Sequence, residues 1–397
     1  MDWLGKFLEL PQEFLNCSEG PGGGIIQGSA SEAILVAVLA AREQAVNRLK
    51  KEHPDWSESD IRGKLIAYTS DQSNSAVEKA GLLAAVPMRQ IPSDENCCLR
   101  GEAVQAALNE DIRNGKIPII CVATLGTTGT CAQDNLPELG PVCQENNIWL
   151  HIDAAYAGAA LCCPELRPQM PGIEWADSFN FNLHKWMMVN FDCCAMWFKN
   201  ADHIVDSFTV DRIYLDHKYQ GESKAPDYRH WQIPLGRRFR ALKVWVVLRT
   251  VGAEKIRENI RYHLRLAERF ENYVKNDNRF ELVIPRSMGL VCFRLKGDCS
   301  LSKELLERIT ERKQIYMIHA TCHKRIMIRF VICGLEPKEA DVDFAWQEIQ
   351  SQANELFVRH SLPMLNASEK NNDALVDKIE TKFSEDLNIN TDAEKIK

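Results

Sequence analysis

An aspartate and a lysine stand just beyond two short runs that read as neighbouring β-strands. Asp153 follows an apolar run over residues 148–150, and Lys185 follows a β-like run over residues 178–182, in the pair His184–Lys185. Burying either charge is costly unless the charge is paired or takes part in chemistry. The spacing therefore indicates either a structural acid–amine pair or a reactive site.

The neighbours of Lys185 favour chemistry. Phe181, Trp186 and Met187 lie beside it in the sequence, and desolvation by such groups is expected to lower the pKa of the amine and make it nucleophilic. A nucleophilic lysine near an acid fits a pyridoxal 5'-phosphate (PLP) site, with Lys185 as the Schiff-base residue and Asp153 keeping the pyridine nitrogen protonated. The alternative is a buried structural Asp–Lys pair in an α/β core, which the spacing alone does not exclude.

Two polar turns are candidate binding sites for a phosphate. A Gly-rich turn ends at Gly28 and is followed by Ser29 and Ser31 at the start of an Ala- and Leu-rich helix. Backbone N–H groups and the helix dipole favour an anion there, although an ordinary helix cap explains the same residues. The second turn carries Thr127 and Thr128, whose hydroxyls can serve the same phosphate or the cofactor ring, or simply form a turn.

Three further residues have a structural and a chemical interpretation. His184 either satisfies a hydrogen bond in the core or assists proton movement at the cofactor. Asn74 lies at a strand-to-helix turn and is read as a helix cap. Tyr214, on a long loop of weak periodicity, is either a surface residue or a proton donor once the loop closes. Three arginines beyond this loop either bind an anion or cover a helix start: Arg237, Arg238 and Arg240.

The order of the predicted elements indicates an α/β fold. Strands alternate with helices as far as about residue 242, which predicts a mostly parallel sheet with its ligand at the carboxyl ends of the strands. A helix over 254–275 then leads into alternating strands and helices. We therefore expect a large domain over 1–242, a smaller α+β domain over 243–360 and a disordered polar tail over 361–397.

Composition excludes several classes of function. The chain has 397 residues, 45% of them hydrophobic, and a formal net charge of −7, so neither nucleic acid nor a membrane is an expected partner. The fourteen cysteines include adjacent pairs, which make poor disulfides, and show no zinc-binding spacing. We expect reduced thiols, no metal and a cytoplasmic location.

Taken together, the motifs resemble the group II PLP-dependent amino-acid decarboxylases, in the aromatic-L-amino-acid decarboxylase branch. The resemblance covers nearly all of residues 1–360. It rests on the stretches MDWLGKFLELP, GGGIIQGSASEA, SDQSNSAVEKAG, VATLGTTGTCAQDNL, WLHIDAAYAGAA, DSFNFNLHKWMMVNFDC and DYRHWQIPLGRRFRALKVW. It implies the type I aminotransferase-like fold, PLP as cofactor and a homodimer with active sites at the interface.

The resemblance also implies residue roles. Lys185 resembles the Schiff-base lysine, Asp153 the partner of the pyridine nitrogen, and Ala155 the residue packed on the ring. His184 resembles the histidine beside the reactive lysine, and Tyr214 the mobile-loop tyrosine that protonates the substrate Cα. The phosphate and nearby cofactor contacts correspond to Ser29, Ala30, Asn182, Ser31 and Thr128.

Asn74 departs from the ordinary decarboxylases, which have a histidine over the cofactor ring. Asn74 and Leu183 resemble the insect 3,4-dihydroxyphenylacetaldehyde synthases. Asparagine is neither an acid nor a base near pH 7, so the carbanion left by CO2 loss is expected to meet O2. The leading hypothesis is then an enzyme that converts L-Dopa into an aldehyde, CO2, ammonia and hydrogen peroxide.

Two alternatives stay open at this point. One is a plain aromatic amino-acid decarboxylase that releases an amine, which Tyr214 favours; a histidine decarboxylase ranks below it. The other is a non-catalytic remnant, because Met1 falls inside the family domain and the family's N-terminal helical segment is not in this sequence. Loss of a segment that wraps the partner exposes apolar surface, so weak PLP binding and weak dimerisation are expected under this alternative.

Overall fold

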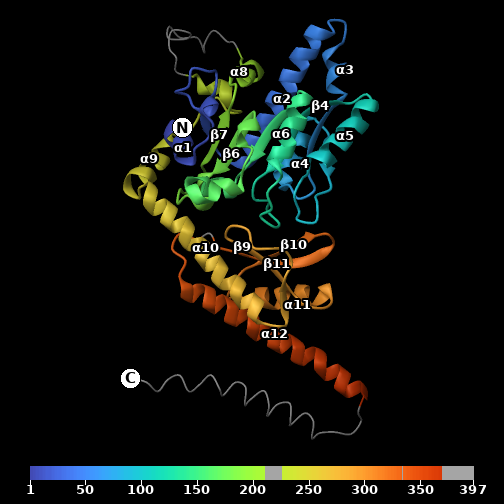
Figure 1. Cartoon of the computed structure of the whole chain (residues 1–397), viewed down its shortest axis with the longest axis vertical. Coiled ribbons are helices and arrows are strands. Elements are labelled where there is room, and N and C mark those ends of the chain that lie inside the picture. The colour runs from blue at the N-terminus through green and yellow to red at the C-terminus, as the bar shows by residue number, and fades with distance from the viewer. Residues whose placement is uncertain (211–225, 333, 369–397) are drawn as a thin grey trace.

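The computed structural model describes residues 1–210, 226–332 and 334–368. Two sheets organise these residues, a large one above and a smaller one below in Figure 1. The strands of the large sheet are β1 (Gly23–Gln27), β2 (Leu65–Ser70), β3 (Met88–Ile91), β4 (Ile117–Thr124), β5 (Trp149–Asp153), β6 (Ser178–Asn182) and β7 (Cys194–Phe198). Its helices are α1 (Asp2–Leu8), α2 (Ala30–Glu52), α3 (Glu58–Arg62), α4 (Ser75–Ala84), α5 (Gly101–Arg113), α6 (Leu136–Glu145), α7 (Leu183–Trp186) and α8 (Asp202–Phe208).

Strand direction in the large sheet decides where polar side chains gather. The order is β1-β7-β6-β5-β4-β2-β3, and β7 alone runs against the other strands of this sheet. The carboxyl ends of the six parallel strands therefore meet at one edge, as the predicted mostly parallel sheet requires. The strand over 178–182 is confirmed at its predicted bounds by β6.

Helices cover both faces of this sheet. Along β7, Cys194, Met196 and Phe198 pack in one cluster with α2, α4 and α8, whereas Ala195 and Trp197 pack in the other with α1, α5 and α6. This alternation is the period of two that a strand buried on both faces must show. The sheet is thus enclosed, and its carboxyl edge is where polar groups emerge.

The second sheet is antiparallel, with the order β10-β11-β9-β8, and belongs to an α+β unit as predicted. Its elements are α10 (Ala253–Asn276), β8 (Phe280–Leu282), β9 (Leu290–Leu295), α11 (Cys299–Arg312), β10 (Ile318–Cys322), β11 (Arg325–Val331) and α12 (Glu339–Ser368). The helix expected over 254–275 is confirmed within one residue by α10. Helix α9 (Ala241–Thr250) leads into it, and Gly252 breaks the two helices apart with a φ of 83°.

Phe270 is the centre of this smaller unit. It is 0% exposed, stacks on Phe330 at 3.8 Å between ring centroids and contacts the edges of Phe293 and Trp346. We expect Phe270→Ala to lower the free energy of unfolding of this unit by about 3–5 kcal/mol, because truncation leaves a cavity among the rings. Urea unfolding measures the change. Phe344→Ala, on a side chain 47% exposed, is the matched control with an effect of about 0.5 kcal/mol or less; equal effects would contradict the assignment of the core.

Two sequence-based expectations need correction. Cys97 and Cys322 form a disulfide, whereas all cysteines were expected to be reduced. Adjacency in sequence could not reveal this pair, because 225 residues separate the two positions. In addition, α12 runs to Ser368, so the predicted polar tail does not begin at 361; residues 369–397 lie outside the described range. The domain boundary expected near residue 242 falls inside α9 and stays a prediction.

Across residues 1–210, 226–332 and 334–368, no helix combines the length and apolarity that crossing a bilayer demands.

Candidate functional site

The predicted site residues meet at the carboxyl edge of the large sheet. Asp153 ends β5, and the β6 strand beside it ends one residue before α7, which carries Lys185. The turn after β2 carries Asn74, and the turn after β4 carries Thr128. Ser29 follows β1, whose last residue lies beside the ends of β7 and β6. The sequence order of strands and turns is therefore converted by the parallel topology into one polar surface.

Asp153 is buried and its carboxylate is oriented. Oδ1 accepts hydrogen bonds from Ala155 N and Asn180 Nδ2, both at 3.1 Å, and Oδ2 accepts none within the described part of the chain. Burial raises the pKa of Asp153, and the charge of Lys185 opposes that rise. The free Oδ2 is therefore a strong acceptor for a protonated ring nitrogen, which would also restore the charged form.

A chain of hydrogen bonds, not foreseen from the sequence, fixes Asp153 from behind. Asn180 Oδ1 accepts from His151 Nε2 at 2.8 Å, and His151 Nδ1 contacts Ser178 Oγ at 2.7 Å. Ser178 Oγ in turn accepts from Trp149 Nε1 at 2.7 Å. Because Asn180 Nδ2 donates to Asp153, Asn180 Oδ1 must accept from His151 Nε2. Burial lowers the pKa of His151, so the ring is neutral with its proton on Nε2, and Nδ1 accepts from the Ser178 hydroxyl. The alternation of polar residues in FNFN along β6 was the available signal for Asn180.

The buried His151 should make stability depend on pH. Desolvation lowers its pKa from 6.5 to about 4. As the pH falls from about 6.5 to 4 the unfolded chain takes up a proton that the folded chain does not, so the free energy of unfolding should decrease, by up to about 3 kcal/mol. Urea midpoints over this range in the wild type and in His151→Gln test this. His263 is shared by both proteins, so a loss of slope in the variant belongs to His151, and identical slopes would refute the assignment.

Lys185 corrects another expectation. It is exposed, not buried among aromatic rings, because Leu183 and Trp186 are the residues of α7 that point inward. Phe181, Trp186 and Met187 therefore do not enclose its amine in the single chain. The structural alternative fails equally, since a side chain in solvent is no buried ion pair. Lys185 instead lines a cavity of about 200 Å³ together with His184, Asn259 and His263.

His184 is held in one tautomer. Its Nδ1 accepts a hydrogen bond from Cys193 N at 2.9 Å, which leaves the proton of the neutral ring on Nε2. Desolvation lowers the pKa of His184. The Phe191 ring packs against the imidazole in an edge-on arrangement, with 4.7 Å between the ring centroids. The imidazole is therefore a neutral N–H donor beside Lys185.

Asn74 does two things at once. Its Oδ1 accepts from Ala76 N at 2.9 Å and so caps α4, as the structural interpretation predicted. Its Nδ2 donates to Thr128 Oγ1 at 2.8 Å, which joins the turns after β2 and β4. Thr127, by contrast, is buried and hydrogen-bonded to Thr130 within its own turn. The side-chain amide of Asn74 is thus fixed at the edge that carries Asp153.

The start of α2 offers a place for an anion. Ser29 is the N-cap, with Oγ accepting from Glu32 N at 3.3 Å, and Ala30 and Ser31 form the first turn. Across the ends of β1, β7 and β6, Gln27, Cys194 and Asn182 are paired in register. A helix N-terminus attracts negative charge through its free N–H groups and its dipole. This is the local geometry that the predicted phosphate contacts require.

Asn182 adds an independent observation at this place. Its side chain is buried, and Oδ1 has no hydrogen-bond partner among the described residues. The backbone N of Asn182 donates to Ala155 O at 3.0 Å, and Ala155 N donates to Asp153. Asn182 and Asp153 are therefore linked through the backbone of Ala155, a residue with only a methyl side chain, which leaves room for a flat ring.

Two of the three arginines that follow the long loop bind Asp192, a residue that the sequence analysis did not single out. Arg238 and Arg240 form ion pairs with Asp192, and Lys243 lies 3.8 Å from the same carboxylate. Arg237 instead lies over the Tyr228 ring. Asp192 also sits against Gly28, where an added Cβ would come within 3.2 Å of its Oδ2 and within 2.7 Å of Glu32 Oε2. A larger residue at position 28 would therefore crowd two carboxylates, of which the flexible Glu32 side chain can move aside. Tyr214 lies outside the described residues.

The donor set fits PLP. A buried carboxylate with an unused oxygen, an exposed amine and a helix N-terminus lie on one edge. These are the groups that a ring nitrogen, an aldehyde and a phosphate need. Fold and site together define the class of PLP-dependent enzymes of the type I fold.

Comparison with known proteins gives the family. The family described as the pyridoxal-dependent decarboxylase conserved domain matches residues 1–296, and the chain belongs to it. It is 62% identical over 354 residues to a 3,4-dihydroxyphenylacetaldehyde synthase of Aedes aegypti, covering 89% of this chain and 68% of the relative. It is 51% identical over 355 residues to an aromatic-L-amino-acid decarboxylase of Drosophila lebanonensis, covering 89% and 88%.

Solved structures agree in fold. Oryza sativa TDC, solved with PLP and tryptamine, has a TM-score of 0.85 at 33% identity, over 89% of this chain and 74% of that one. A Rhodiola rosea 4-hydroxyphenylacetaldehyde synthase has a TM-score of 0.80 at 34% identity, over 89% and 73%. The expected fold class and the PLP cofactor are confirmed.

Proposed function

We propose that this enzyme decarboxylates an aromatic L-amino acid, L-Dopa above others, and oxidatively deaminates it. The balanced reaction takes L-Dopa, O2 and water to 3,4-dihydroxyphenylacetaldehyde, CO2, ammonia and hydrogen peroxide. The observation that carries the proposal is Asn74, whose amide is fixed between the α4 cap and Thr128. The 62% identity to an aldehyde synthase supports it.

The proposed roles follow from the geometry. Bound PLP supplies the electron sink for loss of CO2. Lys185 attaches the cofactor, and Asp153 Oδ2 keeps its ring nitrogen protonated, so that the sink is retained. His184 donates through Nε2 beside the amine. Ala155, whose side chain is only a methyl group, would pack against the ring.

The phosphate contacts of the proposal belong to two neighbouring segments. Ser29 and Ala30 offer the α2 N-terminus, and Asn182 offers its buried side chain, with Ser31 and Thr128 close by. Tyr214 is proposed to deliver a proton to Cα when the loop closes over the substrate.

Asn74 decides the product. A histidine over the ring can donate a proton near pH 7, whereas an amide cannot. The amide of Asn74 is not an acid near pH 7, and its hydrogen bonds to Ala76 N and Thr128 Oγ1 hold it in place. Without a proton donor at this position, the electrons left by loss of CO2 would pass to O2, which gives hydrogen peroxide, and hydrolysis would release the aldehyde and ammonia.

The test is the amount of hydrogen peroxide released per CO2 from L-Dopa in air by the PLP-loaded enzyme. Equal amounts support the aldehyde synthase. CO2 without peroxide, together with dopamine, would overturn it and leave the plain decarboxylase. That second function is favoured by the 51% identity to an aromatic-L-amino-acid decarboxylase over 88% of that relative.

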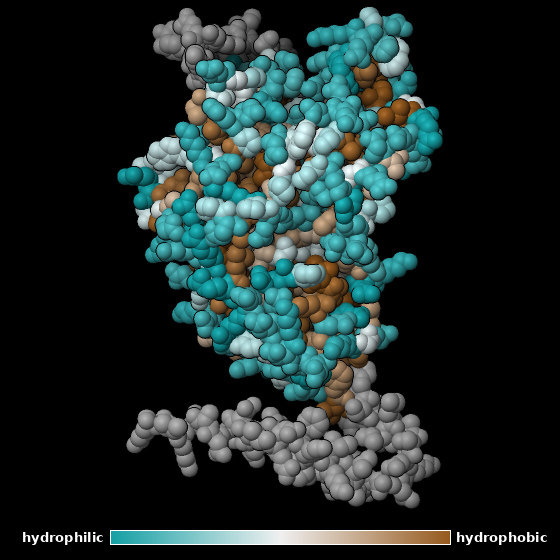
Figure 2. All heavy atoms as spheres, in the orientation of Figure 1, coloured by the Kyte–Doolittle hydropathy of each residue, from teal (hydrophilic) through white to brown (hydrophobic). Residues whose placement is uncertain are grey.

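We also propose that the active form is a cytoplasmic homodimer. Five exposed apolar residues lie on both sides of the start of α9 and form an apolar strip: Leu235, Phe239, Leu242, Trp245 and Val246. Hydrophobic surface is visible in this region at the left edge of Figure 2. A strip of this kind marks an interface, and a second copy would bring its own strip to the same contact. Sedimentation of the wild type beside Trp245→Asp measures it, with the shift to monomer expected for the variant and not for Phe344→Asp.

A further inference from the structure

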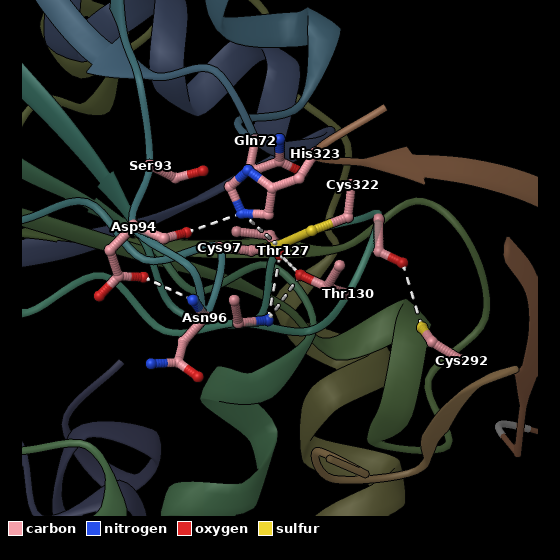
Figure 3. Close-up of a disulfide and its surroundings, with 12 residues drawn as sticks. Gln72, Ser93, Asp94, Asn96, Cys97, Thr127, Thr130, Cys292, Cys322 and His323 are labelled. Atoms are coloured by element: carbon pink, nitrogen blue, oxygen red, sulfur yellow. Dashed lines mark hydrogen bonds between the residues drawn. A yellow bond between two sulfur atoms is a disulfide. The ribbon is translucent and has the colours of Figure 1, made fainter. Parts of the chain in front are cut away.

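One pair of cysteines joins the two sheets of the molecule. Cys97 lies in the loop between β3 and α5, and Cys322 ends β10 of the small sheet. Their sulfur atoms are bonded across 225 residues of sequence, and both residues are buried (Figure 3). Within the described range, the other cysteines are free thiols. This bond therefore links the two units at a single, chemically distinct point.

The linked hairpin, β10–β11, rests on the turn that follows β4. Arg329 Nε donates to Gly129 O at 3.0 Å, and Cys292 Sγ lies 3.5 Å from the same oxygen. Ala320 also lies close to this turn, since a Cβ added to Gly129 would be 3.8 Å from the Cβ of Ala320. Gly129 follows Thr128, which accepts the hydrogen bond from Asn74. The disulfide thus holds the small sheet against the turn that forms one side of the cofactor edge.

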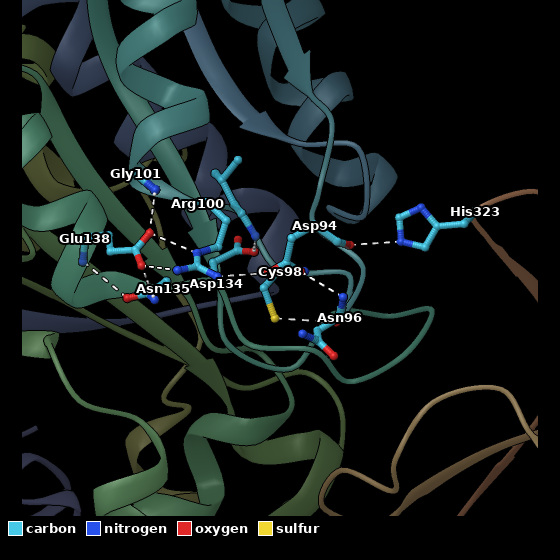
Figure 4. A network of polar contacts seen from close by, with 10 residues as sticks. Asp94, Asn96, Cys98, Arg100, Gly101, Asp134, Asn135, Glu138 and His323 are labelled. Carbon is cyan, nitrogen blue, oxygen red and sulfur yellow. Dashed lines mark hydrogen bonds and ion pairs between the residues drawn. The ribbon is translucent and has the colours of Figure 1, made fainter.

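The surroundings of Cys97 suit a reactive thiol. His323 Nε2 lies 4.0 Å from Cys97 Sγ and 2.9 Å from Asp94 O (Figures 3 and 4). An imidazole beside a sulfur favours the thiolate, the form that attacks peroxides and disulfides. Among the free thiols, burial raises the pKa of Cys131 to about 12, whereas the hydrogen bond with Cys162 lowers the pKa of Cys163. Cys97 is distinguished by the combination of a neighbouring imidazole and a partner sulfur already bonded to it.

Small molecules have access to this loop. A cavity of about 590 Å³ is lined by Asp94, Asn96, Cys98 and Arg100, the residues on both sides of Cys97 (Figure 4). Arg100 pairs with Glu138 and Asp94 and so keeps the loop in place. The cavity reaches Cys98, the residue next to Cys97, but not the buried Cys97 itself, so peroxide reaches the Cys97 sulfur only when this loop opens locally.

We propose that Cys97 and Cys322 are a reversible dithiol–disulfide couple that hydrogen peroxide oxidises and that a small dithiol reduces, and that the closed bond slows loss of PLP. In oxidation, the Cys97 thiolate attacks peroxide, its O–O bond breaks and one water leaves. The Cys322 sulfur then displaces the oxygen from Cys97 as a second water, so two thiols and one H2O2 give one disulfide and two waters. In reduction, a dithiol is oxidised to its cyclic disulfide while both thiols are restored. Hydrogen peroxide is a product of the proposed function. Only the supply of this oxidant in the cell rests on that function.

The chemical half is tested on the PLP-loaded enzyme without amino acid. The protein is reduced with dithiothreitol, freed of it, exposed to H2O2, alkylated with iodoacetamide and digested for mass spectrometry. A peptide pair linked through Cys97 and Cys322 should appear with peroxide and disappear with fresh dithiothreitol. Cys98→Ser is the matched control and should form the same link, whereas Cys97→Ser should not.

Other outcomes would overturn this half. Absence of the Cys97–Cys322 link after peroxide, or links spread over many cysteines of the wild type, would show that the pair has no special reactivity. Because no substrate is present and the peroxide is added, the result does not depend on whether the enzyme makes an amine or an aldehyde.

The functional half is measured as the rate of PLP loss after dilution into an excess of apo-acceptor. The oxidised wild type should lose PLP several-fold more slowly than the reduced protein, because the small sheet then cannot leave the turn at Gly129. Cys98→Ser should keep this difference, and Cys322→Ser should lose it. Equal rates in the two wild-type forms would overturn the coupling to the cofactor edge.

Discussion

Lys185→Ala is expected to lose at least about 10⁴-fold in turnover, since removal of a covalent residue costs catalysis on this scale. Its amine is the exposed one beside His184 at the cofactor edge, and alanine cannot attach an aldehyde. Initial rates of CO2 release from L-Dopa measure the loss. Borohydride treatment of the PLP-loaded wild type should also leave a reduced cofactor on the peptide that contains Lys185.

Lys199→Ala is the matched control for this substitution. Lys199 directly follows β7, and because β7 runs against its neighbours, it lies at the opposite edge of the same sheet. Its replacement should leave the rate unchanged. If Lys185→Ala kept wild-type activity, or if borohydride marked a different lysine, the PLP site would have been assigned to the wrong side chain.

Asn74→His is expected to change the product with little loss of CO2 release. An imidazole can protonate Cα before O2 reacts, so the ratio of peroxide to CO2 should fall from near one to near zero while dopamine appears. The helix cap is lost in this variant, at a cost of about 1 kcal/mol, so the ratio of products and not the rate is the informative measurement.

Asn74→Ser separates the cap from the chemistry. Serine caps a helix well and is no acid near pH 7, so it should keep α4 in place and still release peroxide. If Asn74→His released as much peroxide per CO2 as the wild type, Asn74 would be a helix cap only, and the choice of product would lie with other residues.

Strand and helix positions were largely predictable from sequence because each element carries its own signal. The run over 178–182, the amphipathic helix over 254–275 and the serine cap of α2 follow from local spacing. The direction of β7 does not follow from sequence, because the hydrophobic pattern of a strand is the same whether it pairs parallel or antiparallel with its neighbours. The gathering of Asp153, Asn74 and Thr128 at one edge followed from the parallel topology alone.

The remaining features depend on distant contacts. Lys185 was expected to be buried because its neighbours are aromatic, yet α7 turns those neighbours inward and the lysine outward. The role of Asn180 had only the FNFN alternation as a sequence signal and is defined by its contact with Asp153, whereas Asp192 became visible only through the two arginines that it binds. The bond between Cys97 and Cys322 likewise needs both sheets to be in place before the two sulfurs meet.

The reversal of β7 also determines how the reactive amine can travel. Since Asn182 and Cys194 are paired across β6 and β7, and Leu183 N donates to Cys193 O at 3.0 Å, the segment bearing Lys185 is anchored to the sheet at both of its ends. The main chain around Lys185 is therefore held in place by the sheet. The amine must reach and release its partner by rotation about the four-carbon side chain, a motion of picoseconds to nanoseconds for an exposed residue. Exchange between lysine and substrate should therefore proceed without any rearrangement of the sheet.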